Sequence, residues 1–192
     1  MATALIPQQL SNLVEPLFQR YTKPVFKTAR DDWRSPCEIT TDDQFSYWRP
    51  IVQSPRMSFE DFEAAIELPL HPDLKTFYGS FWSGAIPGFF QDRAISLIQI
   101  WNPDDFERLI SNLIGHYLSQ KSVAPPRLTW FIATFEDGGE DIISLDNRSG
   151  EIVCETPGRH QHQVLAASLT DFLTMFTVDP LKLCPIELLN DD

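Results

Sequence analysis

The chain has 192 residues, and its 27 Asp and Glu against 15 Lys and Arg leave a net charge of −12. A surface this acidic repels nucleic-acid phosphate and anionic lipid headgroups, so it argues against nucleic-acid binding and a direct lipid anchor, and for basic protein partners. The whole acid excess lies after residue 34, because residues 1–34 carry a small positive charge. Hydrophobic residues make up 43% of the sequence, so we expect a folded single domain over residues 1–192.

The N-terminus and the cysteines indicate the compartment. The first ten residues lack a basic segment followed by a long apolar run, and no stretch approaches the roughly 18 apolar residues of a membrane-spanning helix. The three cysteines, Cys37, Cys154 and Cys184, are widely spaced and odd in number, which fits reduced, buried thiols. We therefore expect a cytoplasmic protein.

The N-terminal third begins with a helix and continues irregularly. Apolar residues recur at helical spacing from Leu10 to Tyr21, and Pro16 either kinks this helix or shortens it. The basic stretch from Lys23 to Arg34 has no clear periodicity, and we interpret it as an irregular connection. The aromatic segment Phe45–Trp48 then predicts a short strand that ends before a proline.

The middle of the chain alternates between helical and strand patterns. Ser58 with Asp61 resembles a capping box and predicts a short helix reaching Ile66. A second helical pattern spans Leu74–Trp82, and Ile95–Trp101 is typical of an internal strand. Asn102 suits the N-cap of a long helix, because a proline and two aspartates follow it and apolar residues continue to Leu118.

The last third predicts a run of strands. Leu128–Phe135, Asp141–Leu145 and Glu151–Thr156 are strand candidates joined by Gly- and Asp-rich hairpin connections. Ser168 predicts the start of a closing helix. The segment from Thr177 onward shows no regular pattern, so we expect a domain core of about residues 10–176 and a C-terminal tail of 177–192. This order predicts an α+β fold whose mixed, largely antiparallel sheet is flanked by helices.

No pattern predicts catalysis or a cofactor. The sequence lacks a glycine-rich phosphate loop and a nucleophile elbow, so we expect no enzyme activity and no cofactor. His160 and His162 form a weak metal pattern that an exposed polar loop explains better, and His116 is better explained as a packed histidine, so we expect no metal site. A hydrolase with paired carboxylates stays a minor alternative, which two carboxyls about 5–9 Å apart in a deep pocket would support.

The acidic residues form clusters, and most of these have a structural explanation. Asp104 and Asp105 suit the first turn of a helix, and the acids from Glu136 to Asp141 suit a hairpin. Asp42 and Asp43 have no such explanation. Glu63 and Glu67 lie four residues apart and would repel each other on one helix face, which is a modest hint of an external cation.

An ordered series of motifs resembles the Syd family of SecY-interacting proteins. The resemblance spans roughly Leu10 to Phe176, and the series is more specific than any single motif. The matching segments are SPCEITTDDQFSYWRP (35–50), LKTFYGSFWSG (74–84), LIQIWNPDDFERLISNLIGHYLSQK (97–121), LTWFIAT (128–134) and LDNRSGEIVCET (145–156).

The resemblance implies both a fold and a function. Syd proteins are similar to the SUKH superfamily, which implies an α+β fold. The family implies a protein that binds the cytosolic side of SecY, the channel subunit of the translocon, through an acidic groove and monitors translocon assembly. It would then associate peripherally with the cytoplasmic side of the inner membrane, and we expect a monomer. The positions that match the acidic groove are Asp42, Asp43, Asp61, Glu63, Glu67 and Asp73.

The superfamily also implies a second function. Other SUKH members resemble immunity proteins that neutralise toxins, and an acidic chain suits a basic toxin. Cytoplasmic loops of membrane proteins are enriched in Lys and Arg, so the translocon offers equally suitable basic segments. We take SecY binding as the leading hypothesis and toxin immunity as the alternative.

Overall fold

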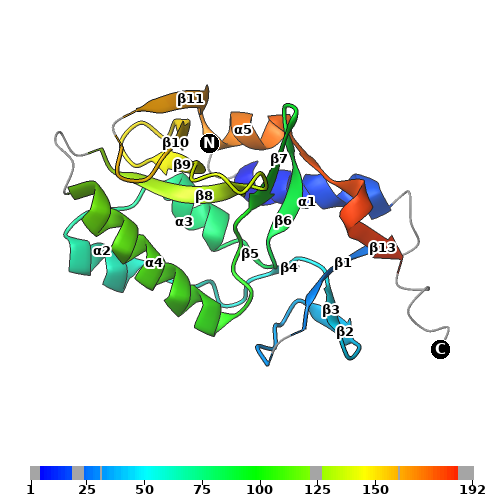
Figure 1. Cartoon of the computed structure of the whole chain (residues 1–192). Coiled ribbons are helices and arrows are strands. Elements are labelled where there is room, and N and C mark those ends of the chain that lie inside the picture. The colour runs from blue at the N-terminus through cyan, green and yellow to red at the C-terminus, as the bar shows by residue number, and fades with distance from the viewer. Residues whose placement is uncertain (1–4, 19–23, 31, 122–126, 160, 186–192) are drawn as a thin grey trace.

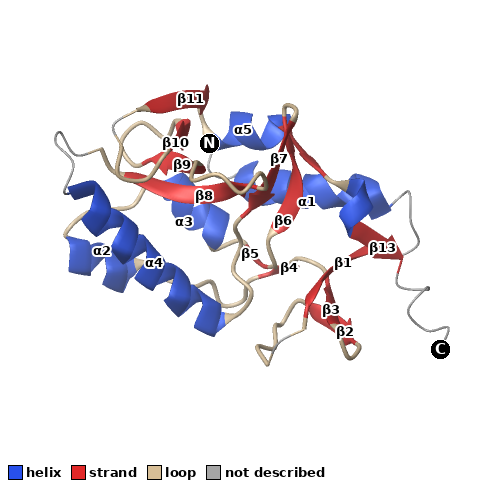
Figure 2. Cartoon of the chain, in the orientation of Figure 1, coloured by secondary structure: helices blue, strands red, loops and turns tan. Residues whose placement is uncertain are grey.

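The computed structural model describes residues 5–18, 24–30, 32–121, 127–159 and 161–185. Figure 1 shows a curled sheet with helices packed around it and a smaller sheet set apart at the lower right. All pairs between named strands are antiparallel, and the described residues also include five α-helices, as Figure 2 shows. The predicted α+β class is therefore confirmed. No helix in these ranges combines the length and apolarity needed to cross a bilayer.

The larger sheet has seven strands in the order β11-β10-β9-β8-β7-β6-β12. Sequence neighbours pair from β6 to β11, which makes most of the sheet a meander, and β12 returns to pair with β6. Its strands are β6 (Ile86–Phe90), β7 (Arg93–Leu97), β8 (Thr129–Phe135), β9 (Ile142–Asp146), β10 (Ile152–Glu155), β11 (His162–Ala166) and β12 (Phe176–Val178).

The smaller sheet joins the two ends of the described chain. Its order is β13-β1-β3-β2, so a strand from the C-terminal region lies beside one that follows the first helix. A two-stranded sheet, β4-β5, links it to the larger one. These strands are β1 (Pro24–Ala29), β2 (Glu38–Thr41), β3 (Phe45–Trp48), β4 (Ile51–Val52), β5 (Phe81–Trp82) and β13 (Leu183–Pro185).

Side-chain caps mark the two helix starts that the sequence predicts best. Asn102 Oδ1 accepts a hydrogen bond from the Asp105 amide at 2.8 Å, and Ser168 Oγ accepts one from the Asp171 amide at 3.1 Å. The helices are α1 (Ile6–Phe18), α2 (Glu60–Ile66), α3 (Pro72–Tyr78), α4 (Pro103–Lys121) and α5 (Leu169–Met175), and a short 3₁₀ turn covers Pro180–Lys182.

Four local predictions are wrong. The basic stretch after α1 contains β1 rather than an irregular connection, and the segment from Thr177 contributes to β12 and forms β13. The helix predicted over Leu74–Trp82 ends at Tyr78, and its last residues form β5. Ser58 makes no capping box, because its hydroxyl accepts a bond from the Glu60 amide and α2 begins with Phe59 as its N-cap.

Strands β2, β6 and β11 were not predicted. His162, expected in an exposed loop, is exposed but begins β11, and His160 lies outside the described residues. The predicted end of the first helix, residues 19–21, and the end of the tail, residues 186–192, also lie outside them.

Asn147, in the turn between β9 and β10, ties the sheet to the loop that precedes α3. Its side-chain Oδ1 accepts bonds from the His71 amide at 2.8 Å and from Trp130 Nε1 at 2.7 Å, and its Nδ2 donates to the Pro69 carbonyl at 3.0 Å. Trp130 is fully buried and packs edge-on against Phe62 of α2. One polar side chain therefore fixes the position of α2 and α3 against the sheet.

Candidate partner-binding surface

Groups that commonly carry chemistry are dispersed or internally satisfied. Within the described ranges, no three His, Cys, Asp or Glu side chains gather as a metal site requires. Burial raises the pKa of the Cys37 thiol to about 12, so this sulfur stays protonated at neutral pH. Cys37 and Cys154 are both free thiols.

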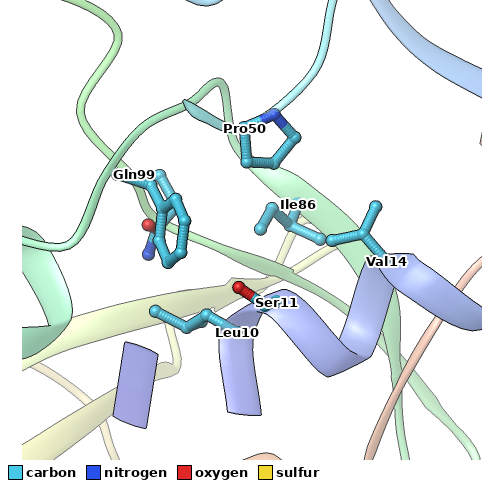
Figure 3. Close-up of a pocket in the computed structure, with 7 residues that line it drawn as sticks. Leu10, Ser11, Val14, Pro50, Ile86 and Gln99 are labelled. Atoms are coloured by element: carbon cyan, nitrogen blue, oxygen red, sulfur yellow. The ribbon is translucent and has the colours of Figure 1, made fainter. Parts of the chain in front are cut away.

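Figure 3 shows a small pocket between α1 and the strands that face it. Its volume is about 170 Å³, and Leu10, Val14 and Ile86 form much of its wall, with Ser11 and Gln99 contributing polar groups. Pockets for drug-sized molecules usually measure about 300–1,000 Å³. This pocket is therefore suited to nothing larger than a small apolar group.

Asp42 and Asp43 lie in the turn that joins β2 to β3, and both are exposed. The Asp42 carboxylate accepts bonds from the Tyr47 hydroxyl at 2.6 Å and from the amides of Gln44 and Phe45. These donors, the Tyr47 hydroxyl above all, lower the pKa of Asp42. Asp42 thus shapes the turn while keeping its negative charge at the surface beside Asp43.

Glu63 already has an internal cation. Its Oε1 lies 2.8 Å from Lys75 Nζ and accepts a bond from the Leu70 amide at 2.7 Å, and its pKa is lowered because these donors outweigh the effect of burial. The helix ends at Ile66, and Glu67 follows in a left-handed conformation with φ 53°. The idea of an uncompensated Glu63–Glu67 pair on one helix face is therefore wrong.

The remaining predicted acids differ in exposure. Asp61 and Glu67 are exposed on α2 and at its end. Asp73 in α3 is buried, and its Oδ2 lies 4.0 Å from His71 Nδ1. Asp61 and Glu67 are thus accessible to a partner, whereas Asp73 faces the protein interior.

The accessible acids form two separate groups. Figure 1 shows the β2–β3 hairpin at the lower right and α2 at the far left, with α4 between them. We call Asp42 and Asp43 the hairpin acids, and Asp61 and Glu67 the helix acids. The structure does not bring the two groups into one compact cluster, so a single segment would have to cross the α4 side of the molecule to reach both.

A hollow of about 250 Å³ lies between the smaller sheet and the start of α4. Trp33 and Trp101 line it, with Arg108 5.4 Å above the Trp33 ring. Its one carboxylate among the described lining residues is Asp105, which Arg108 neutralises at 2.6 Å. A carboxylate pair of the kind a hydrolase uses does not line this hollow.

Glu38, at the start of β2, is a charged residue whose environment the sequence did not predict. Its side chain is only 3% exposed, and Arg34 Nη2 lies 2.9 Å from its Oε1. The contact lacks hydrogen-bond geometry, so neither carboxylate oxygen accepts a hydrogen bond from the described residues. The sequence signal was limited to the position of Glu38 within a conspicuous motif at 35–50.

A buried polar network lies between α4 and the larger sheet. The Thr129 amide donates to Gln120 Oε1 at 3.1 Å, which turns the Gln120 amide nitrogen toward His116 Nε2 at 2.8 Å. His116 therefore accepts a bond through Nε2 and is neutral. Thr129 Oγ1 donates to Glu155 Oε1 at 2.5 Å, and His116 is packed as the sequence predicted.

This network makes stability depend on pH. Burial lowers the pKa of His116, and Glu155 nearby only partly offsets this. The unfolded chain therefore takes up the proton first, so stability is complete above about pH 6.5 and falls as the pH drops below that value. We expect His116→Gln to flatten the loss seen in urea denaturation between pH 7.5 and 5.5. An unchanged slope in the variant would show that other groups cause the loss.

Comparison with known proteins gives consistent matches over most of the chain. The family model described as Syd protein (SUKH-2) matches residues 8–178. Protein Syd of Psychromonas ingrahamii is 38% identical over 146 residues, which cover 76% of this chain and 78% of the relative. Protein Syd of Cronobacter sakazakii is 40% identical over 145 residues, covering 74% and 78%. The family match includes Glu38 and both groups of acids.

Proposed function

Since this chain belongs to the Syd family, we propose that it is a non-enzymatic binding protein that recognises the basic cytosolic loops of SecY and monitors translocon assembly. The observation that carries the proposal is the placement of charge. The hairpin acids and helix acids are exposed in a chain with a net charge of −12. Exposed carboxylates of this kind attract Lys- and Arg-rich segments.

The same charge sets how the protein would reach the membrane. The cytoplasmic leaflet is negatively charged and repels an acidic chain, so attachment depends on the protein partner rather than on lipid. Cytoplasmic loops of membrane proteins carry an excess of Lys and Arg. The protein would therefore act as a peripheral protein at the cytoplasmic side of the inner membrane.

Salt dependence tests this proposal. We expect the full chain to capture purified, detergent-solubilised SecYEG at 50 mM NaCl and to lose at least 90% of it at 500 mM, because the Debye length shortens from above 10 Å to below 8 Å. Binding measured by pull-down at a series of salt concentrations checks this. Absence of capture at low salt, or capture that salt leaves unchanged, would contradict the proposal.

A further inference from the structure

Two nearly buried carboxylates, Asp105 and Glu38, each lie against an exposed arginine, and they differ in how well they are satisfied. Asp105 Oδ2 accepts a bond from the Trp101 amide at 2.8 Å, and its Oδ1 accepts one from Arg108 Nε at 2.9 Å. Glu38 has only the ion pair with Arg34 at 2.9 Å, without hydrogen-bond geometry. Asp105 is a completed structural contact, whereas Glu38 keeps unused acceptor capacity.

The cation that covers Glu38 is held loosely. The Arg34 side chain is 66% exposed, so water competes with Glu38 for its guanidinium and the pair contributes little. The Arg34 backbone is fixed separately, because Asn102 Nδ2 donates to its carbonyl at 2.9 Å. The guanidinium is therefore free to move away while the loop stays in place.

An ionised carboxylate with so little exposure is costly unless donors satisfy its oxygens. A second cation that brought well-directed N–H donors would therefore replace Arg34 favourably. We infer that Glu38 receives a Lys or Arg side chain of the basic partner, and that Arg34 occupies this position until the partner displaces it. The inference rests on the proposed function and names a contact within it.

The position of Glu38 allows a partner segment to reach it. Strand β2 is the edge of the smaller sheet, and Ile39 beside Glu38 is 47% exposed. The same strand leads from Glu38 directly to the hairpin acids Asp42 and Asp43. A basic segment that follows β2 meets Glu38 at one end and the hairpin acids at the other.

The two partners of the ion pair predict opposite effects on binding. Glu38→Gln removes the docking charge and should weaken binding at least fivefold. Arg34→Ala removes the competitor and should strengthen binding at least threefold. Arg159→Ala is the matched control, because it frees an exposed acid, Glu140, from an exposed arginine and changes the net charge equally. It should change binding less than twofold.

Two probes separate this inference from the proposed function. Affinity is measured for detergent-solubilised SecYEG and for a labelled ten-residue peptide of alternating Arg and Ser, by fluorescence anisotropy. Failure of the unmodified chain to bind SecYEG contradicts the proposed function, and the peptide then decides the inference. Binding that Arg34→Ala strengthens no more than Arg159→Ala overturns the displacement, even if Glu38→Gln proves unstable, because Arg34 is a surface residue.

Discussion

Replacing Asn147 by alanine should lower the free energy of unfolding by about 3 kcal/mol, since each buried donor left without an acceptor costs about 1–3 kcal/mol. The change removes the acceptor for Trp130 Nε1 and for the His71 amide, as well as the donor to the Pro69 carbonyl. Trp130 is fully buried, so water cannot replace the lost bond without disturbing the packing. Urea denaturation followed by tryptophan fluorescence measures the loss.

Asn12→Ala is the matched control for this prediction. Asn12 is exposed on α1 and accepts a bond from the Gln8 side chain at 2.8 Å. Surface substitutions of this kind change stability by less than about 0.5 kcal/mol. Similar losses in the two variants would show that Asn147 is not the link between the sheet and the loop before α3.

The parts of the fold that the sequence predicts are those with local causes. The start of α4 follows from Asn102 and the proline and aspartates after it, all within one helical turn. Strand β1 was missed because its partners are β3 and β13, and residue 25 pairs with residue 184. Pairing across such a distance leaves no pattern in the six residues of β1, and the same holds for β12 and β13.

The site shows the same limit. Counting acids identified Asp42, Asp43 and Glu63, but the sequence contains no sign that Lys75, twelve residues away, neutralises Glu63. The burial of Glu38 was equally invisible, because it depends on how the β2 strand packs. Sequence therefore predicts the sign of the surface charge, and only the structure separates acids that are occupied from those that are available.

Reversing three exposed acids, Asp43→Lys, Asp61→Lys and Glu67→Lys, should weaken binding to SecYEG at least tenfold. The physical reason is that complementary charges raise association rates, while like charges facing a basic loop repel it. The three side chains are exposed, so stability should fall by no more than about 1 kcal/mol, mainly because Asp61 lies in the first turn of α2. Pull-down and urea denaturation of the same preparation measure both effects.

The control must change the net charge equally on another part of the surface. Asp92, Glu136 and Glu140 are exposed in the turns at the ends of β7 and β8, and their reversal alters the net charge by the same six units. This variant should retain most of its binding at 150 mM NaCl, because charges farther apart than about 8 Å are largely screened there. Equal losses in the two triple variants would mean that total charge, and not the hairpin and helix acids, attracts the partner.

Glu63→Ala separates the two roles that acids have in this chain. Glu63 is engaged by Lys75 and by the Leu70 amide, so its loss should lower stability by about 1–2 kcal/mol and leave binding within twofold of the unmodified chain. The triple reversal should do the opposite. If Glu63→Ala instead weakened binding as strongly as the triple reversal, Lys75 would have to release Glu63 to the partner, and the division between occupied and available acids would be wrong.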